Sequence, residues 1–429
     1  VNLIYPPKKY IDYEALEESK KHLAAAKKAT EAEKLTREEK ARAKADYKRF
    51  TKAKEPKQLV IYAEKQGYYK YFRRLIEALL ATTDVTIHYV TSDPHDAILR
   101  TQEPRIVPYF IDTNRLIMLF MLVDSDIMLM SLPDLDTFHL KRSYIRTDMA
   151  YIYVHHGIIG GLNVLRDHAL DAYDTIFCGE SNQKREMEEY LEKAGLPPKT
   201  LVECGYGVIE DIHEEYLKLM EKEEPHERRR ILIAPSWQPD NILESCLDTI
   251  LEKLANDDNE IIIRPHPQSF TSEAELIGGL MERYPESDRL EWNRDNDNFD
   301  ALRRSDILIS DFSGVIFDFS LVFDKPVIYA DTSFDKAPYD ACWLDEELWT
   351  FETLPRIGMP LTRESLPELG AVIDRCIGDP ELRRNREQVR QECWMHVGEA
   401  ASRTVDYLLE KYDRLTEEAL AEEETAAAL

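Results

Sequence analysis

Turns that carry histidine, serine or aspartate directly after a short apolar run are the parts of this sequence best suited to chemistry. The first is His155-His156-Gly157, which ends the run Tyr-Ile-Tyr-Val. A neutral imidazole near pH 7 is a competent general base. Because neighbours on an extended segment face opposite ways, one histidine should pack and the other should face solvent. His156, beside the glycine, is the predicted base.

The second turn, Arg264-Pro265-His266-Pro267, follows the apolar run 261–263. Its two prolines restrict the backbone and hold the histidine at a low entropic cost. Arg264 and His266 lie on the same side of an extended segment, so both can face a phosphate. The alternative is a structural turn with a capped histidine.

The third turn leads from a predicted strand into a predicted helix and contains Ser310, Asp311, Ser313 and Gly314. The unpaired N–H groups of a helix start, the Ser313 hydroxyl and the missing side chain of Gly314 together make an anion cradle. The alternative is that Ser313 and Asp311 only cap the helix.

A fourth turn, with Ser236 and Trp237, offers a hydroxyl for a ligand and an aromatic ring that either stacks or packs. The chain has no GxGxxG, Walker, HExxH or GxSxG motif, which removes support from dinucleotide oxidoreductases and P-loop NTPases. Asp134 and Asp136 have the spacing of a metal pair, but aspartates at strand ends are usually solvated turn formers. No metal site is therefore predicted.

Alternating strands and helices must position these turns. From Gln58 onward, short β-branched runs alternate with amphipathic helical patterns, which predicts parallel sheets covered on both faces. The expected strands are 59–63, 86–90, 106–110, 127–131, 151–155, 175–178, 202–204, 231–234, 260–264, 306–310 and 326–330. The charged segment 214–230 separates two such units. We predict an α/β protein of two doubly wound Rossmann-like domains facing across a cleft, after a long N-terminal helix. The expected boundaries are 1–57 (basic helical segment), 58–225, 226–395 and 396–429 (helix and acidic tail).

Composition narrows the functional classes. The 429 residues hold 55 Lys and Arg against 82 Asp and Glu, a net charge of −27, which argues against a protein that binds nucleic acid over its whole surface. The six cysteines form no CxxC pair, so reduced thiols of a cytosolic protein are expected. Asp124 and Asp126 interrupt the most apolar run, 116–132, and make a membrane span too costly. The first residue is valine, so we expect that an upstream segment was processed or left out.

Residues 1–57 have the opposite charge to the rest. They hold 16 Lys and Arg against 10 Asp and Glu, a net +6, which leaves −33 for the remainder. The simpler interpretation is a solvated helix with mixed charges. The sharper one is a basic stalk near an anionic membrane, where each cation contributes about 1 kcal/mol.

These motifs together resemble the CDP-glycerol glycerophosphotransferase family, the polymerases and primases of teichoic-acid-type polymers in bacterial cell walls, which have a GT-B fold. The resemblance rests on the His-Gly turn, Ala-Pro-Ser-Trp, Arg-Pro-His-Pro and Ser-Asp-Phe-Ser-Gly-Val-Ile-Phe-Asp, and covers roughly 58–405. It implies a CDP-alditol donor in the C-terminal domain, a lipid-linked or polymer polyol or sugar phosphate as acceptor, no cofactor or obligatory metal, and no nucleic acid. It also implies a cytoplasmic enzyme that is peripheral at the inner face of the cell membrane, touching it through the N-terminal helix.

The resemblance also implies residue roles. His156 would be the base for the acceptor hydroxyl, with His155 and Gly157 on the acceptor side, and His266 the second catalytic histidine. Donor contacts would come from Arg264, Ser236, Ser310, Asp311, Ser313 and Gly314. The sequence departs from the family pattern in two places: no basic residue follows the His-Gly turn, and glycine stands at 314 where serine is common.

The leading hypothesis is therefore a transferase that moves glycerol phosphate, or a related alditol phosphate, to a cell-surface acceptor and releases CMP. One alternative is a GT-B glycosyltransferase that uses a nucleotide sugar in surface polysaccharide synthesis. A second is a non-catalytic partner of a polymer-synthesis complex that docks through the N-terminal helix, although that stretch has no sustained apolar heptad stripe.

Overall fold

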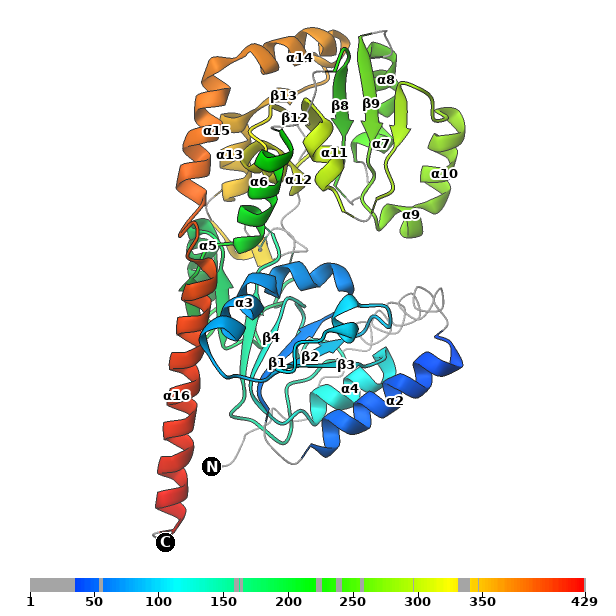
Figure 1. Cartoon of the computed structure of the whole chain (residues 1–429). Helices are drawn as coiled ribbons and strands as arrows, with labels where there is room; N and C mark the ends of the chain where they lie inside the picture. The colour runs from blue at the N-terminus through cyan, green and yellow to red at the C-terminus, as the bar shows by residue number, and fades with distance from the viewer. Residues whose placement is uncertain are drawn as a thin grey trace, which may run out of the picture.

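Two parallel β-sheets, each covered by helices, form the two halves of the molecule (Figure 1). The computed structural model describes residues 35–53, 57–157, 162, 165–220, 226–236, 241–254, 258–295, 297–330, 340–345 and 347–427. Trp237 and most of the expected N-terminal helix lie outside these residues. The predicted class, an α/β protein of two Rossmann-like units with the GT-B arrangement, is confirmed.

The first sheet has seven strands in the order β3-β2-β1-β4-β5-β6-β7. All its pairings are parallel. The strands are β1 (Lys57–Ala63), β2 (Ile87–Thr91), β3 (Ile106–Phe110), β4 (Ser125–Met130), β5 (Ala150–Val154), β6 (Thr175–Cys178) and β7 (Thr200–Glu203). Its central strands are apolar on both sides because each face carries its own buried cluster.

Helices cover both faces of this sheet. One face packs against α4 (Thr113–Met121), α5 (Ser181–Lys193) and Phe50 of α2 (Arg37–Lys52), and the other against α3 (Tyr69–Thr82). Two short 3₁₀ helices, η1 (Gln66–Tyr68) and η2 (Ala97–Arg100), follow β1 and β2. A capping box at Thr36 and Glu39 starts α2.

The second sheet has six strands in the order β10-β9-β8-β11-β12-β13, again parallel. They are β8 (Arg229–Ile233), β9 (Asn259–Ile263), β10 (Leu290–Trp292), β11 (Ile307–Ser310), β12 (Val327–Ala330) and β13 (Gly358–Leu361). The helices around it are α6 (Gly207–Met220), α7 (Ile242–Ser245), α8 (Leu247–Leu254), α9 (Ser269–Ser272), α10 (Ala274–Arg283), α11 (Phe299–Arg304), α12 (Val315–Phe317), α13 (Trp349–Ile357), η6 (Leu366–Glu368), α14 (Leu369–Gly378) and α15 (Pro380–Cys393).

The helix expected over 313–323 is broken. The α-helical part, α12, has three residues and continues as a π-helix, η4 (Asp318–Val322). A π-turn widens the backbone, and such turns are frequent at functional sites. The break follows directly on the turn that the sequence predicts to bind the donor.

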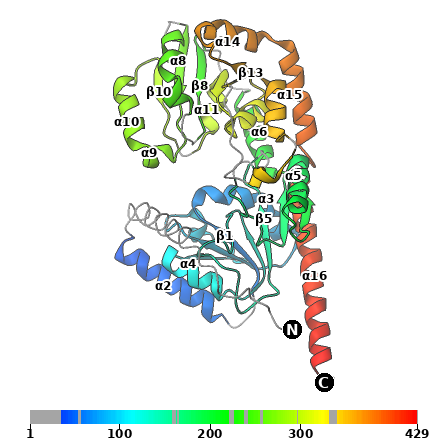
Figure 2. The ribbon, with the colours of Figure 1, turned by 180° about the vertical axis from the view of Figure 1, so that it is seen from behind.

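Two segments cross from the second half to the first. The last helix, α16 (Ala400–Ala427), runs back along the first half (Figures 1 and 2), where the Tyr407 hydroxyl lies 2.7 Å from the Thr175 hydroxyl. The 3₁₀ helix η5 (Asp340–Trp343) also packs into the first half's core through Ala341. The two halves are therefore held together by packed side chains as well as by the chain connections.

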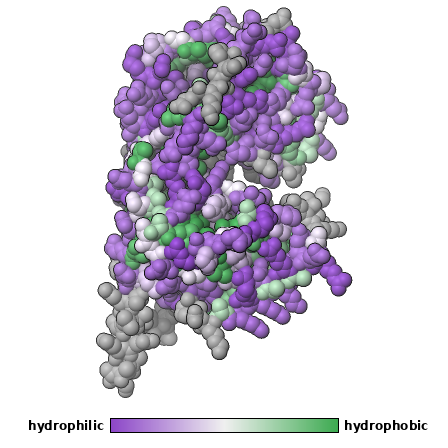
Figure 3. All heavy atoms as spheres, viewed as in Figure 1, coloured by the Kyte–Doolittle hydropathy of each residue, from purple (hydrophilic) through white to green (hydrophobic). Residues whose placement is uncertain are grey.

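Hydrophobic residues gather near the level where the halves meet, between mostly hydrophilic surfaces (Figure 3). Among the residues described, no helix is both long and apolar enough to cross a bilayer.

Candidate active site at the junction of the two halves

His156 lies just beyond the carboxyl end of β5, where ligands of parallel sheets bind. It is half-buried, and its Nδ1 lies 3.2 Å from the Tyr153 hydroxyl. The rings of Tyr71 and Tyr68 stand 5.8 and 6.5 Å from its ring. Burial, and then the positive charge of Lys70, lower the pKa of His156. The imidazole is therefore neutral at physiological pH and has one nitrogen held by a tyrosine.

His155 occupies a different environment. It is 6% exposed and packs edge-on against the Tyr153 ring at 5.2 Å. Burial lowers the pKa of His155 to about 3, so it stays uncharged. Next to the pair, the Gly157 carbonyl accepts a hydrogen bond from Gln183 Nε2 at 3.1 Å, which holds the turn against α5.

Two of the tyrosines around His156, Tyr68 and Tyr71, come from the turn after β1, which is not among the turns predicted from the sequence. Tyr68 ends η1, and Tyr71 lies in the first turn of α3. Tyr68 bonds to the Glu64 carboxylate, and burial followed by that charge raises the pKa of Tyr68 to about 12. The signal was a dense aromatic run, Tyr68, Tyr69 and Tyr71, directly after a predicted strand.

Acidic residues of the second half approach this turn. Lys70 Nζ lies 3.9 Å from an oxygen of Asp297. Burial raises the pKa of Asp318, at the start of the π-helix, to about 6, against the opposing effect of Lys70 and a hydrogen bond from Asn298. The first turn of α3 and the π-helix therefore face one another at the junction.

Asp311 joins two of the predicted donor turns. It is fully buried, and its carboxylate accepts hydrogen bonds from the Ser236 N–H (2.9 and 3.0 Å), the Ser236 hydroxyl (2.9 Å) and the Ser313 N–H (3.1 Å). Ser310 is also fully buried and donates to the Ala234 carbonyl at 2.6 Å. Ser310 and Asp311 thus connect the turns after β8 and β11, while Ser313 and Gly314 are half-buried.

The side chains of Arg264 and His266 lie in different environments and do not face a ligand together. The Arg264 guanidinium is buried and donates to Asn293 Oδ1 beyond β10, because its side chain turns sideways across the sheet edge. His266 is exposed, and its Nδ1 accepts from the Gln268 N–H at 3.2 Å. Loss of hydration, and then the Arg264 charge, lower the pKa of His266. Of the two, His266 is the exposed side chain and Arg264 the buried one.

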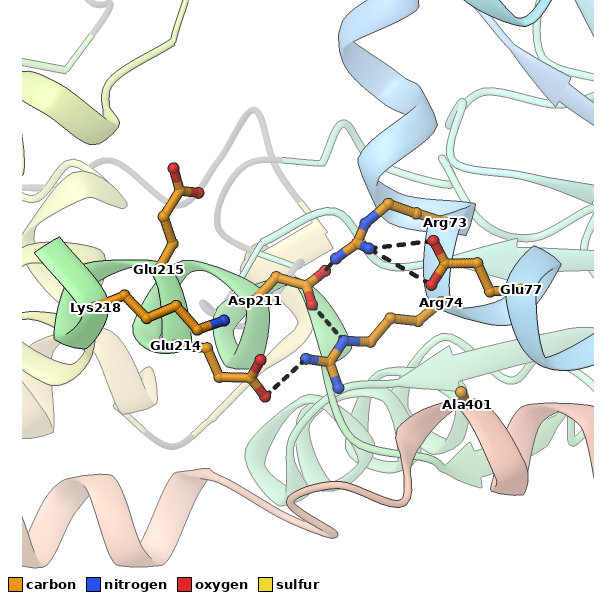
Figure 4. Close-up of a pocket in the computed structure, with 8 residues that line it drawn as sticks. All are labelled: Arg73, Arg74, Glu77, Asp211, Glu214, Glu215, Lys218 and Ala401. Atoms are coloured by element: carbon orange, nitrogen blue, oxygen red, sulfur yellow. Dashed lines mark hydrogen bonds and ion pairs between the residues drawn. The ribbon is translucent and has the colours of Figure 1, made fainter. Parts of the chain in front are cut away.

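Two cavities lie near these residues. A polar one of about 570 Å³ between α3 and α6 is lined by Arg73, Arg74, Glu77, Asp211, Glu214, Glu215, Lys218 and Ala401 (Figure 4). Both of its arginines are paired with carboxylates, and its four carboxylates outnumber its three cations, which does not favour a phosphate there. A smaller cavity, about 50 Å³, lies behind His155 and is lined by Phe177, Cys204 and other residues at the ends of β5 to β7. Among the residues described, no group of three or more His, Cys, Asp or Glu is placed to hold a metal ion.

Residues 197–343 match the family model described as CDP-Glycerol:Poly(glycerophosphate) glycerophosphotransferase. This segment holds the turns at Ser236, Arg264, His266 and Ser310 to Gly314. No curated protein matches the chain.

The fold is similar to that of several solved structures. The wall teichoic acid polymerase TagF superposes with a TM-score of 0.54 at 17% identity, over 93% of this chain and 99% of that one. A putative UDP-N-acetylglucosamine 2-epimerase from Listeria monocytogenes gives 0.56 at 16%, over 84% and 98%. The S. aureus MnaA–UDP structure gives 0.52 at 15%, over 83% and 98%.

At these identities the structural matches show the fold, and the family model bears on residues 197–343. The three donor-side turns lie inside the matched segment, and the histidine turn lies across the junction from it. Residues 197–343, about a third of the chain, are thus similar in sequence to the CDP-glycerol glycerophosphotransferase family.

Proposed function

We propose that this protein transfers glycerol phosphate, or a related alditol phosphate, from a CDP-alditol to a hydroxyl of a polymer or lipid-linked acceptor in teichoic-acid-type synthesis. The observation that carries the proposal is the half-buried, uncharged His156 at the junction, opposite the segment that matches the family model. An uncharged imidazole accepts a proton at neutral pH.

In the proposed reaction His156 acts through Nε2. We assign the ring proton to Nδ1, which lies 3.2 Å from the Tyr153 oxygen, so that Nε2 takes the acceptor's proton. The acceptor oxygen forms a bond to the β-phosphorus of the donor while the bond between that phosphorus and the bridging oxygen breaks. CMP leaves with the electron pair, and the glycerol phosphate stays on the acceptor.

The second half would hold the donor. We place its phosphates at His266, the Ser313 hydroxyl and the open backbone at Gly314, with positioning and charge neutralisation supplying most of the rate. Ser236, Ser310 and Asp311 act as positioning residues in this proposal, because their polar groups are occupied by one another or by the backbone. Arg264 is also a positioning residue here, since it is buried and donates to the Asn293 side chain. The proposal assigns no step to a resident metal or cofactor.

A product assay tests this function. Purified protein is incubated with CDP-glycerol, CDP-ribitol or a panel of UDP-sugars and an acceptor that ends in glycerol phosphate, and nucleotide products are resolved by mass. CMP from a CDP-alditol is expected, with His156→Gln and His266→Ala reducing kcat by about 10²–10⁴-fold. His139→Gln, at an exposed histidine outside the site, is the matched control. A nucleoside diphosphate released only from a UDP-sugar would instead establish the glycosyltransferase alternative.

We also propose peripheral contact with the cytoplasmic face of the membrane through α2. Lys40, Lys44, Lys48 and Lys52 are all exposed and follow one another at the spacing of one helical stripe. Phe50 on the opposite side is buried in the first half's core, so the stripe is held rigidly. Sedimentation with phosphatidylglycerol vesicles should fall when Lys40, Lys44 and Lys48 are changed to Gln, and should not fall for Lys253→Gln. Equal sedimentation of both variants would contradict this contact.

A further inference from the structure

Helix α3 presents three cations toward the second half, at positions one helical turn apart: Lys70, Arg73 and Arg74. Both arginines are paired with carboxylates. Arg73 pairs with Asp211, and Arg74 bonds to Asp211 at 2.5 Å and Glu214 at 3.3 Å (Figure 4). Arg74 also bonds to Glu210 at 2.6 Å. These contacts join α3 to α6, and the carboxylates compensate the charge of both arginines.

Lys70 is different. Among the residues that the structure describes, it has one ion pair, to Asp297, which is long at 3.9 Å, and the two side chains are 45% and 64% exposed. Exposed pairs of this kind contribute about 0–1 kcal/mol, so a phosphate can displace the carboxylate at little cost. A lysine ammonium is a compact charge with three donors, suited to a phosphate oxygen.

The position of Lys70 is as informative as its weak pairing. Its Nζ lies 5.4 Å from the centre of the Tyr71 ring, which in turn lies 5.8 Å from the His156 ring. Its charge acts on His156 in the first half and on Asp318 in the second. Lys70 is therefore a cation at the junction, in front of the proposed base, on the half that the acceptor is proposed to approach.

We propose that Lys70 binds the acceptor through the phosphate that precedes its reactive hydroxyl, and so places that hydroxyl at His156. The inference rests on the proposed function, since it uses an acceptor that carries a phosphate one glycerol unit from the attacking oxygen. Without Lys70, the tyrosines around His156 can pack against the glycerol carbons but cannot neutralise the phosphate. Asp297 holds the ammonium in place until the acceptor arrives.

Steady-state kinetics test the assignment. KM for a glycerol phosphate oligomer, KM for CDP-glycerol and kcat are compared for wild type, Lys70→Met, Lys70→Arg and the control Lys253→Met. A charge-assisted hydrogen bond is worth about 1.5–3 kcal/mol, so Lys70→Met should raise the acceptor KM about 10–100-fold. The donor KM should stay within about twofold, and Lys70→Arg should restore most of the acceptor binding. An unchanged acceptor KM, or a loss confined to the donor KM, overturns the inference.

A binding measurement separates this inference from the proposed function. Glycerol 3-phosphate is titrated onto the full chain with ¹³C-labelled histidine, and the ring signal of His156 is followed by NMR. The wild-type Kd should rise at least about 10-fold in Lys70→Met, and the His156 signal of that variant should titrate at higher pH because a nearby cation has been removed. If wild type releases no CMP but these changes in Kd and titration occur, the proposed function is wrong and the assignment of Lys70 as a phosphate-binding residue is supported. If wild type does not bind the probe, or binds it as the variant does, the assignment is wrong.

Discussion

Replacing Asp311 with alanine should destabilise the second half far more than removing any single hydrogen-bond donor to Asp311 would. The carboxylate is fully buried and accepts from the Ser236 N–H, the Ser236 hydroxyl and the Ser313 N–H. A methyl group in its place leaves all three donors without an acceptor. An unsatisfied buried donor costs about 1–3 kcal/mol.

The expected net loss is smaller than the sum of these costs. Burial raises the pKa of Asp311, so the folded state already bears a cost for the charged carboxylate, and alanine removes that cost. Breaking one side of a buried charged network typically destabilises by about 3–5 kcal/mol, and we expect Asp311→Ala in that range. Ser236→Ala removes one hydroxyl and keeps its N–H bond, so about 1 kcal/mol is expected.

Hydrogen exchange followed by mass spectrometry is the suitable assay, since two packed halves need not unfold in one step. Peptides over β8 and β11 should lose protection in Asp311→Ala, by about 2 kcal/mol more than in Ser236→Ala, or roughly thirtyfold in exchange rate. Peptides over β1 and β4 in the first half serve as the internal control. Equal protection in the two variants would refute the view that Asp311 joins the donor turns.

Three further predictions concern pH and the junction. The fall of kcat/KM on the acid side of its pH profile should be centred below pH 6.5, because burial and Lys70 lower the pKa of His156 and protonation removes the base. A fall centred above pH 6.5 would contradict the role of His156 as the base. Arg74→Met should leave the buried carboxylate of Glu210 without its guanidinium partner. The free energy of unfolding, measured with urea, should therefore fall by about 1–3 kcal/mol. An unchanged value would show that this ion-pair network is not needed for stability. Burial raises the pKa of Asp340 to about 7, so the folded state holds the extra proton and wild-type stability falls as pH rises from about 4 to 7. The Tm of Asp340→Asn should fall less than the wild-type Tm over this pH range. The same pH dependence of Tm in both proteins would contradict the prediction.

Much of the fold could be predicted because it depends on the local pattern of apolar residues. Strands of a doubly covered parallel sheet are buried on both faces and read as continuous apolar runs. The runs before Ser236, Arg264 and Ser310 are of this kind, and the structure places β8, β9 and β11 there. The rule that ligands bind beyond the carboxyl ends of such strands then selects the same turns that the site contains.

Short edge strands and irregular helices could not be predicted from this pattern. β10 and β13, at the two ends of the second sheet, have three and four residues and no apolar run long enough to stand out. The helix after Gly314 carries a helical pattern, but its hydrogen bonding changes to a π-turn at Asp318. Local periodicity does not reveal such a change, because it depends on tertiary packing, and the π-helix packs against α6 and α15.

Local sequence pattern was enough to predict the two parallel sheets, the turns that end their strands and the residue types able to bind phosphate there. Which of these turns meet depends on the tertiary packing. Strand order brings the turn after β1 near that after β5, so that Tyr71 stands against His156, and the packing of α3 on α6 brings Lys70 to Asp297. It also turned Arg264 inward and buried Asp311. These outcomes depend on pairings between segments far apart in the chain, whose energies come from shared burial and charge, and no local spacing of residues encodes them.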